Sequence, residues 1–445
     1  MFGQWNREGA TARAATTFDV TQAVLAAYED EDAPDGVVDL PPLEGLSVED
    51  DETVPIPARP SGPDAGRPAL PRSENARKHA QRAIKRAKLD QETGGSSGYR
   101  PNYGHHISGP GQPSIEAEMD SNVFHEATAG YIGKERVAQG DGRVWSLAEL
   151  KEKGFRYQAV DSECTTPILD RNDTIMAVLI APPKGDPTWE NVVSEAAHCL
   201  EDTREKLSFS KKCLQHRRGE FPVQPIGVSY GGGQEYPKRI YHNNNNRKLL
   251  EGLIGRRCFR RLAGHASAGF ATWAPPLYDE YVEYKERLRQ SDPSLRFNFT
   301  NSIWSCTTFN FGPKTVTVQH VDHLNYIYGW CGITALGSFD FRKGGHFVLW
   351  DLELVLEFPA GWTILLPSAY IRHSNTPIGR SETRYSFTQY TAGGLFRWVD
   401  DGFKARSKMS EDEKKEAQKI QRQKLRKGLN LYCKLGDLKR IYKSK

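Results

Sequence analysis

The most constraining feature of this 445-residue chain is a series of short apolar segments between residues 298 and 399. The segments are rich in aromatic and β-branched residues, and Gly, Pro or Asn separates one from the next. Residues of the first kind favour strands, and residues of the second kind form turns. Evenly spaced short strands are typical of a β-sandwich or a jelly roll. We therefore expect a β-rich core over 298–400.

The part of the chain before this core combines strands with helices. Residues 166–183 predict two strands around an Arg-Asn-Asp turn. Apolar residues at helical spacing predict helices over 187–209, 246–262 and 275–290. The expected class is α+β, and we expect 113–297 to form a mixed, largely helical first part of the same domain.

The N-terminal quarter has a different composition. Residues 1–71 are rich in Pro, Asp and Glu and poor in core-forming side chains, which predicts disorder. Residues 72–90 carry many Lys and Arg and predict a basic helix with Ser73 as N-cap. This helix fits a nuclear import signal, a contact to the DNA backbone, or a solvated helix without a partner. With the Gly/Ser/Pro linker that follows, we expect 1–112 to form a mostly disordered arm.

The C-terminal segment 401–445 is expected to be a basic helical tail. Ser410 and Glu413 have the spacing of a capping box, and Gly428 is a suitable helix end. The net formal charge is only +4, so the clustering of basic residues near both ends is more informative about binding partners than the total charge. Together they favour contacts with a polyanion such as DNA.

Cysteine usage and the N-terminus point to an intracellular protein. The sequence has seven cysteines, which is an odd number, and no CxxC motif. A disulfide framework or a zinc ribbon is therefore not expected. The first residues lack the basic-then-apolar pattern of a secretory signal. The sequence contains no run of 18 apolar residues, so no membrane span is predicted. We expect a nuclear location.

The stretch QHVDHLN contains the first two members of a candidate metal site. His320 and Asp322 are two residues apart in a predicted strand, so their side chains project to the same side. His373 follows 51 residues after Asp322 in another predicted strand. Two histidines and one carboxylate are the ligands of non-haem Fe(II) oxygenases. His323 is expected to point away from the metal.

Two further residues suit a dicarboxylate co-substrate. Arg384 lies 11 residues after His373, and a buried Arg needs a carboxylate partner. Its planar fork can bind the distal carboxylate of 2-oxoglutarate in bidentate fashion. Ser386 lies on the same strand face and can donate a hydroxyl. His346 either caps a turn or hydrogen-bonds the co-substrate.

Two alternatives to an oxygenase site remain open. The two histidines could be ordinary core residues with Arg384 in a salt bridge. The fold could also be a cupin that binds another metal without oxygenation, although such a site has no need of Arg384.

The pattern HxD, then His about fifty residues later, then Arg-x-Ser resembles the Fe(II)/2-oxoglutarate-dependent dioxygenases. Within them the chain resembles the TET/JBP-like family, in particular its fungal branch, most closely over 298–399 and more loosely back to about 115. The resemblance implies a double-stranded β-helix (jelly-roll) core with helices packed on one side. It implies Fe(II) held by His320, Asp322 and His373 as the catalytic residues, and 2-oxoglutarate, used with O2, held by Arg384 and Ser386.

The same resemblance implies a substrate. Relatives oxidise methylated bases flipped out of duplex DNA, which favours oxidation of 5-methylcytosine to its hydroxymethyl, formyl and carboxyl forms, with demethylation of N6-methyladenine as a second activity. Tyr390 matches a position that stacks on the flipped base. Asn325 matches a base-reading position where several relatives carry Asp, which puts the preferred base in doubt. Lys238 and Arg239, beside a Gly run and an Asn run, are candidate DNA contacts, or alternatively solvated surface residues.

Other functions use the same residues. A protein or histone oxygenase, or one that acts on RNA, would keep the metal and co-substrate residues and change the groove around them. A non-catalytic DNA-binding module would not need an intact triad with Arg-x-Ser.

Overall fold

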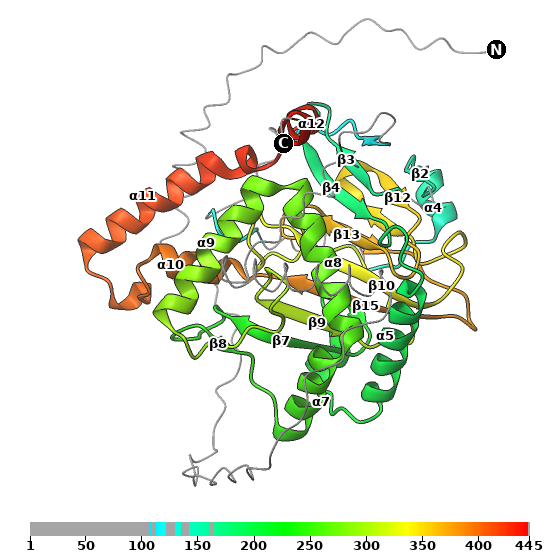
Figure 1. The fold of residues 1–445 in the computed structure, drawn as a ribbon, viewed down its shortest axis with the longest axis horizontal. Coiled ribbons are helices and arrows are strands. Elements are labelled where there is room, and N and C mark those ends of the chain that lie inside the picture. The colour runs from blue at the N-terminus through cyan, green and yellow to red at the C-terminus, as the bar shows by residue number, and fades with distance from the viewer. Residues whose placement is uncertain (1–106, 108–112, 122–129, 135–141, 161–163, 444–445) are drawn as a thin grey trace, which may run out of the picture. The chain divides into compact units, whose positions relative to one another are not determined.

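The described residues form a nine-stranded sheet, a four-stranded sheet, a two-stranded hairpin and a group of helices (Figure 1). The structure is a computed structural model, and it describes residues 107, 113–121, 130–134, 142–160 and 164–443. The predicted arm over 1–112, with its basic helix over 72–90, lies outside the described residues except at Ile107.

The larger sheet has nine strands and runs through the centre of the described chain. Its strands, from one edge to the other, are β1 (Ile115–Glu116), β3 (Thr166–Leu169), β4 (Ile175–Ile180), β13 (Thr363–Leu366), β10 (Cys331–Ser338), β15 (Thr383–Tyr390), β9 (Cys306–Asn310), β7 (Val223–Ser229) and β8 (Lys238–Arg239). Among these described strands, β1 and β3 pair in parallel and the other neighbours pair antiparallel. The sheet thus draws strands from both sides of residue 297.

A second, smaller sheet has four strands. Its order is β14 (His373–Asn375), β11 (Phe347–Leu349), β12 (Leu354–Leu356) and β2 (Arg156–Gln158). From β9 onward the chain alternates between the sheets, with β9 and β10 in the larger, β11 and β12 in the smaller, β13 in the larger, β14 in the smaller and β15 in the larger. A separate hairpin pairs β5 (Gln215–His216) with β6 (Gly219–Glu220).

Helices α5, α8 and α9 lie over one face of the larger sheet (Figure 1). The α-helices are α4 (Leu147–Glu152), α5 (Trp189–Arg204), α6 (Lys211–Leu214), α7 (Asn244–Gly255), α8 (Arg257–Trp273), α9 (Pro275–Ser291), α10 (Gly393–Asp400), α11 (Glu411–Lys427) and α12 (Leu435–Lys443). Short 3-10 turns occur at η2 (Trp350–Leu352), η3 (Arg406–Lys408) and η4 (Gly428–Leu431). Among the described helices, none is both long and apolar enough to cross a membrane.

Small residues on α8 allow this helix to approach the sheet closely. A Cβ added at Gly269 would lie 3.0 Å from Cδ1 of Ile180 on β4, tighter than nearly all real contacts. The next residue, Phe270, stacks on Trp304 and Trp330, with ring centroids 5.5 and 5.7 Å away. Burial of these rings supplies much of the hydrophobic stabilisation of the core between α8 and the sheet.

Several sequence predictions are confirmed. Strands β3 and β4 pair around the predicted turn. Helix α9 matches its predicted range to within a residue, and α5 lies inside the range predicted over 187–209 but ends five residues earlier. Helix α11 begins with the predicted Ser410–Glu413 capping box and ends at Gly428. The capping side chains satisfy backbone N–H groups that have no partner within the helix.

Other predicted elements differ from the structure. The helix expected over 246–262 is two helices, because Arg256 adopts an extended backbone between α7 and α8. The residues after β15 form helix α10 and do not extend the strand. The Asn run begins helix α7 ahead of the predicted start at 246, and the Asn243 side chain caps this helix by accepting from the Asn246 N–H at 2.8 Å.

Candidate metal centre and co-substrate pocket

The three predicted metal ligands, two of them neighbours in the sequence and the third 51 residues later, lie close together. His320, Asp322 and His373 each offer a ligand atom, and these atoms lie within 4.8 Å of one another. Nε2 of His320 is 3.9 Å from Oδ1 of Asp322, and Nε2 of His373 is 3.9 Å from Oδ2. Both imidazoles and the carboxylate therefore face a common centre.

The backbone that carries His320 is not the strand that the sequence predicts. His320 makes an isolated antiparallel bridge to His373, with backbone hydrogen bonds of 3.1 and 2.9 Å in the two directions. Asp322 donates its N–H to the carbonyl of Ser368. Edge pairing with the end of β14 thus replaces a full strand and brings the HxD segment against His373.

Hydrogen bonds fix the orientation of both imidazole rings. Nδ1 of His320 lies 2.8 Å from the carbonyl of Val318, and Nδ1 of His373 lies 2.9 Å from the carbonyl of Ile371. A carbonyl only accepts, so each Nδ1 carries the proton and donates it. The neutral rings then present an unprotonated Nε2 towards Asp322, which is the form a metal requires.

The electrostatics of the triad favour the same protonation states. Burial lowers the pKa of His320 well below its usual value, and the neighbouring His373 lowers it further. Burial likewise lowers the pKa of His373. Burial raises the pKa of Asp322, but its electrostatic interactions with Arg217, the two histidines and Arg218 outweigh that effect and lower it overall. Two neutral histidines and an ionised aspartate result.

Two arginines in the turn of the β5–β6 hairpin complete the surroundings of Asp322. Arg217 donates from Nη2 to Oδ1 of Asp322 at 3.0 Å and also donates to the carbonyl of Val321. Arg218, the next residue, acts electrostatically on both Asp322 and Tyr390. The sequence analysis missed both, because a hairpin turn has no periodic signal; two adjacent arginines before a Gly were the only sign.

Arg384 is a buried cation that pairs with no carboxylate among the described residues. It is 2% exposed, and burial alone lowers its pKa to about 10. Its Nη1 donates to the carbonyl of Thr315 at 3.1 Å, and the ring of Phe339 lies 5.9 Å from its guanidinium carbon. Within the described part of the chain no carboxylate pairs with it. The alternative of a structural salt bridge for Arg384 therefore has no partner in this region.

Polar atoms around Arg384 are buried but unsatisfied. Nε of Arg384, Oδ1 of Asn310 and Oγ1 of Thr315 have no hydrogen-bond partner among the described residues. Asn310 is the cross-strand neighbour of Ser386 and donates from Nδ2 to its hydroxyl at 2.7 Å. Buried polar groups are nearly always paired in folded proteins, so a cluster of unpaired ones marks a place for a polar ligand. A carboxylate would meet the guanidinium, and the triad and this cluster together fit a metal with a dicarboxylate.

The structure brings two predicted substrate residues close to the triad. Tyr390 lies at the end of β15, on the same face as Arg384 and Ser386, and its hydroxyl is 3.4 Å from that of Thr308. Burial raises its pKa, and the charge of Asp322 is near enough to contribute. Asn325 sits one turn beyond Asp322 and donates from Nδ2 to the hydroxyl of Ser368 at 2.9 Å.

Among the described residues, no hydrogen bond or ion pair joins Lys238 or Arg239 to the triad. Both are on β8 at the far edge of the larger sheet. Arg239 donates to the carbonyl of Arg296 at 3.4 Å and lies 3.8 Å from Glu251. Nζ of Lys238 lies 5.7 Å from the ring of Tyr236. Their part in substrate binding stays a prediction.

The remaining histidine of interest occupies a structural position. His346 is fully buried before β11, and its Nδ1 lies 2.9 Å from the hydroxyl of Thr376. The same hydroxyl accepts from its backbone N–H at 3.0 Å. These contacts match the turn-capping role among the two that the sequence left open.

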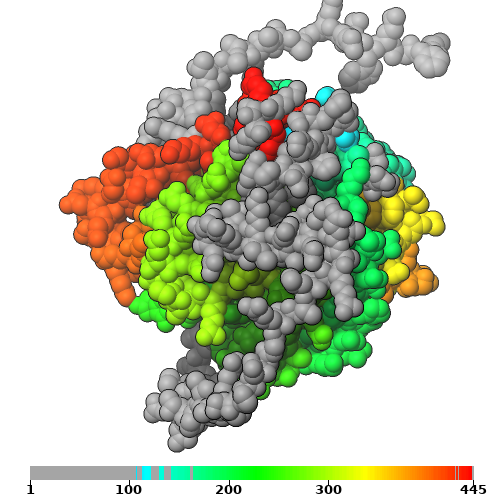
Figure 2. Space-filling view, viewed as in Figure 1, coloured from blue at the N-terminus to red at the C-terminus, as the bar shows by residue number. Residues whose placement is uncertain are grey.

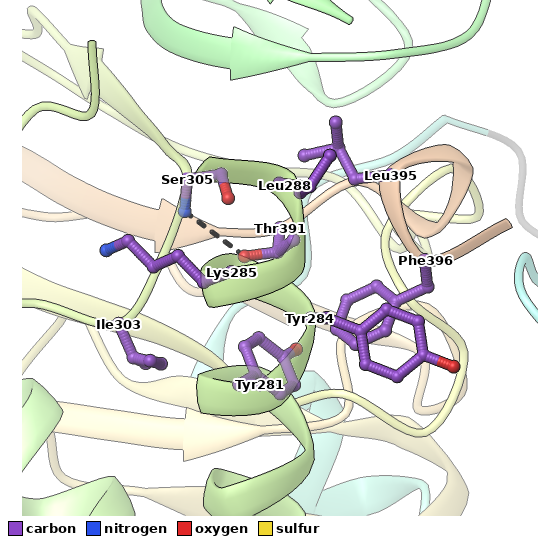
Figure 3. A pocket seen from close by; sticks show the side chains of 9 residues that line it. All are labelled: Tyr281, Tyr284, Lys285, Leu288, Ile303, Ser305, Thr391, Leu395 and Phe396. Carbon is purple, nitrogen blue, oxygen red and sulfur yellow. Dashed lines mark hydrogen bonds between the residues drawn. The ribbon is translucent and has the colours of Figure 1, made fainter. Parts of the chain in front are cut away.

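A pocket beside the end of β15 is separate from the triad (Figure 3). It is lined from α9 by Tyr281, Tyr284 and Lys285, and from the segment after β15 by Thr391 and Phe396. Nζ of Lys285 donates to the carbonyl of Ser302 at 2.7 Å, and burial lowers the pKa of Lys285 to about 7. The lining of this pocket includes no triad residue.

Comparisons with known proteins leave the family open. No family model matches the sequence, and no curated protein matches it. Among solved structures, NgTET1 in complex with 5mC DNA is 12% identical, with a TM-score of 0.39, over 56% of this chain and 89% of that chain. A 2OG-Fe(II) oxygenase family oxidoreductase from Burkholderia pseudomallei is 18% identical, with a TM-score of 0.26, over 44% and 76%.

A third solved structure is more distant. The viral collagen prolyl hydroxylase vCPH from Paramecium Bursaria Chlorella virus-1 is 13% identical, with a TM-score of 0.17, over 25% of this chain and 70% of that chain. TM-scores of this size do not establish a shared fold, and these identities do not establish a shared family.

Proposed function

We propose that this protein is an Fe(II)- and 2-oxoglutarate-dependent dioxygenase that oxidises methyl groups on DNA bases. The observation that carries the proposal is the pairing of a His-Asp-His cluster with a buried Arg384 that lacks a counter-ion among the described residues. We further propose that the alternating strands of the two sheets form a double-stranded β-helix around this site, and that the chain belongs to the TET/JBP-like dioxygenases.

His320, Asp322 and His373 would hold the iron. Each imidazole is held by its own Nδ1 hydrogen bond, so its free Nε2 needs little reorganisation to bind a metal. When bound, iron and 2-oxoglutarate supply, together with O2, the oxidising power that cleaves a substrate C–H bond. Three protein ligands leave the other positions of an iron free for co-substrate and O2.

Arg384 and Ser386 would hold the distal carboxylate of 2-oxoglutarate. The guanidinium is fixed by Thr315, and the Ser386 hydroxyl is oriented by Asn310. A carboxylate bound there would neutralise the buried charge and pair with Nε, which otherwise has no partner in the described chain. The low dielectric constant around buried Arg384 strengthens such an ion pair and favours a dicarboxylate over a neutral ligand.

The substrate part of the proposal rests on Tyr390, Asn325 and the basic residues. Tyr390 offers an aromatic ring close to Asp322, as stacking of an extruded base requires. The exposed side of Arg217 and the neighbouring Arg218 place positive charge beside the same site, which favours an anionic polymer over a Lys-rich peptide. We propose 5-methylcytosine in duplex DNA as the main substrate and N6-methyladenine as a second one.

The direct test is mass spectrometry of nucleosides. Full-length protein is incubated with Fe(II), ascorbate, 2-oxoglutarate and duplexes that contain 5-methylcytosine or N6-methyladenine. We expect oxidised cytosines, and loss of N6-methyl groups at a lower rate, with matching formation of succinate. The Asp322→Ala variant should give neither product, while His323→Ala, which changes the adjacent histidine outside the proposed site, should retain both.

Two outcomes would change the proposal in different ways. Succinate formation without any change in either base would leave the oxygenase and remove the DNA substrate, which would make RNA or a protein the next class to test. Absence of succinate formation together with absence of Fe(II) binding would remove the oxygenase itself and favour a non-catalytic DNA-binding module.

A further inference from the structure

A lysine of the C-terminal helix α11 is buried in an aromatic and acidic cage. Lys424 is 7% exposed although it belongs to the tail that the sequence predicts to be basic and helical. Other lysines of this helix behave differently. Lys414, Lys415 and Lys419 are exposed and pair with acids three residues before them.

The polar partners of Lys424 match the three donors of a primary ammonium group. Nζ donates to Oε1 of Glu280 at 3.2 Å and to the hydroxyl of Tyr284 at 2.5 Å, and it lies 3.2 Å from Oδ2 of Asp400. A lysine ammonium has three N–H donors and no acceptor. Three acceptors around one Nζ therefore satisfy it completely, whereas a quaternary ammonium could replace none of the three hydrogen bonds that Nζ makes.

Aromatic rings close the cage around the ammonium group. The distances from Nζ to the ring centroids are 4.1 Å for Tyr284, 5.5 Å for Tyr326, 5.6 Å for Tyr131 and 5.6 Å for Phe396. Within this range a ring face attracts a cation. Figure 3 shows Tyr284 and Phe396 side by side, and Tyr326 stacks on Phe396 with centroids 3.9 Å apart. The cage is defined by these four rings with Glu280 and Asp400.

The acids and hydroxyls of the cage also hold one another. The Tyr131 hydroxyl donates to Asp400 at 2.8 Å, the Tyr284 hydroxyl also donates to Asp400, and the Tyr326 hydroxyl donates to Glu280 at 2.8 Å. Two largely buried carboxylates without a cation would repel each other, and the surrounding burial would oppose their charge. The cage therefore requires a cation in its centre.

The cage is continuous with the loop that carries Asp322. Tyr326 follows Asn325 directly, and its backbone N–H donates to the carbonyl of Thr391 at 3.0 Å. The N–H of Asn325 donates to the carbonyl of Asp322 at 2.8 Å, so the loop from Asp322 to Tyr326 begins with a hydrogen-bonded turn. A displaced Tyr326 ring would therefore disturb the backbone that places Asp322.

Helix α11 lies against α9, which carries Glu280 and Tyr284 (Figures 1 and 2). The residues after α11 continue into the main core, where Tyr432, Leu438 and Tyr442 are buried. The Tyr432 hydroxyl donates to the carbonyl of Tyr328 at 3.0 Å. The chain after Lys424 is thus anchored to the core close to the cage.

We propose that the cage is a binding site for primary alkylammonium groups, that Lys424 occupies it as a built-in ligand, and that its occupancy positions the Asp322–Tyr326 loop. Lys424 is a positioning residue, because it acts through Tyr326 and touches no metal ligand. The part of the inference that concerns iron rests on the proposed function, whereas the ammonium site does not depend on it. Acetylation or trimethylation of Lys424 would be incompatible with the docked helix, since each removes donors that the cage satisfies.

Chemical rescue tests the ammonium site. In the full-length Lys424→Ala variant, hydrogen exchange followed by mass spectrometry should become at least about tenfold faster in 411–427 and in the Asp322–Tyr326 loop. Millimolar n-butylammonium should restore the loop to its wild-type rate, and n-butyltrimethylammonium should not. The matched control Lys419→Ala, which alters an exposed lysine of the same helix, should change neither segment.

Three results would overturn the proposal. Unchanged exchange in Lys424→Ala would remove the role of Lys424. Equal rescue by the quaternary cation would show that the aromatic rings alone select the ligand and that N–H donors are not needed. Failure of n-butylammonium to act at concentrations up to its solubility would show that the cage is not an ammonium site. If Lys424→Ala does not fold, Tyr284→Phe, which removes a single acceptor and keeps the ring, should give a smaller rise in exchange at both segments, and no rise would contradict the donor match.

Metal affinity tests separately whether the cage positions the loop that carries Asp322. We expect Lys424→Ala to weaken Co(II) binding by about tenfold, as displaced outer-sphere residues commonly do, and n-butylammonium to restore it. If wild-type protein binds no Co(II) or Fe(II), the proposed function fails while the exchange result still decides the ammonium site. If wild type binds the metal and Lys424→Ala binds it equally well, the positioning role is wrong.

Discussion

Arg384 and Lys424 are both buried cations, but their surroundings are opposite. Lys424 has two carboxylates, a hydroxyl and four ring faces within reach. Arg384 has one carbonyl, one ring and an unpaired Nε among the described residues. Since an unpaired buried charge destabilises a fold, the two sites have different purposes. The protein completes the lysine site by itself, and we propose that a ligand completes the arginine site.

The His-Asp-His triad and Arg384 are parts of the same proposed ligand site. Loss of a triad residue should have the largest effect. We expect His320→Ala to lower Fe(II) affinity and turnover by at least about 100-fold, because it removes a direct ligand where loss of an outer partner alone has a roughly 10- to 100-fold effect. Fe(II) titration and succinate formation measure both. The circular dichroism spectrum should be unchanged, and a variant with wild-type turnover would contradict the assignment of the site.

The two cations should differ in their contribution to stability. Lys424→Met leaves Glu280 and Asp400 without their cation, so we expect the free energy of unfolding to fall by about 3 kcal/mol. Denaturant unfolding measures this value. The matched control Lys419→Met, on the exposed side of α11, should change stability by less than about 0.5 kcal/mol. Equal losses in the two variants would contradict the role of the cage.

Arg384→Met should behave in the opposite way. The substitution removes an unpaired buried charge, so stability without ligand should stay within about 1 kcal/mol of wild type or rise. Addition of 2-oxoglutarate and metal at about 100 times the dissociation constant should stabilise wild type by about 2.7 kcal/mol and leave the variant unchanged. A large loss of stability in the unliganded variant would show that Arg384 is a structural residue.

Ser386 should contribute less than Arg384, because it adds one neutral hydrogen bond. We expect Ser386→Ala to raise the KM for 2-oxoglutarate by about tenfold, which corresponds to about 1.4 kcal/mol. Thr388→Ala, two residues further on the same strand face, is a suitable control and should have a smaller effect on this KM. Equal effects of the two substitutions would contradict the specific role of Ser386.

Lys285 is a partly buried lysine, and it should make the stability of the protein depend on pH. Burial lowers its pKa from the ordinary value of 10.5 to about 7, so the unfolded chain binds more protons than the native one between these values. Stability should therefore rise with pH across that window, by at most about 1.4 kcal/mol per pH unit from this group. Unfolding of wild type and Lys285→Met at pH values between about 7 and 9 should show a smaller slope in the variant. Equal slopes would contradict the lowered pKa.

The sequence predicted which residues of the candidate metal site lie together better than it predicted the backbone that holds them. His320, Asp322 and His373 were identifiable from their spacing, and the structure brings them together. The segment around His320 was expected to be a strand, but His320 pairs with the end of β14 through an isolated bridge. Local propensity does not determine which edge is available for pairing, and tertiary contacts decide it.

Contacts between segments far apart in the sequence could not be predicted in the same way. Arg217 lies 105 residues before Asp322, and Lys424 lies 144 residues after Glu280. In a single sequence a lysine on a charged helix gives no sign that it is buried, because the other lysines of α11 are the same residue type in the same charged context. The sequence therefore predicted a basic tail, whereas Lys424 of that tail lies in the cage and the residues after α11 pack into the core.

The most direct test of the oxygenase site is an anaerobic titration of full-length protein with Fe(II) and then 2-oxoglutarate, followed by visible absorbance. The proposal predicts a charge-transfer band that needs both additions, is absent in His373→Ala and needs much more 2-oxoglutarate in Arg384→Met. If wild-type protein gives no band and calorimetry shows no 2-oxoglutarate binding after Fe(II) is added, the site is not that of a 2-oxoglutarate oxygenase.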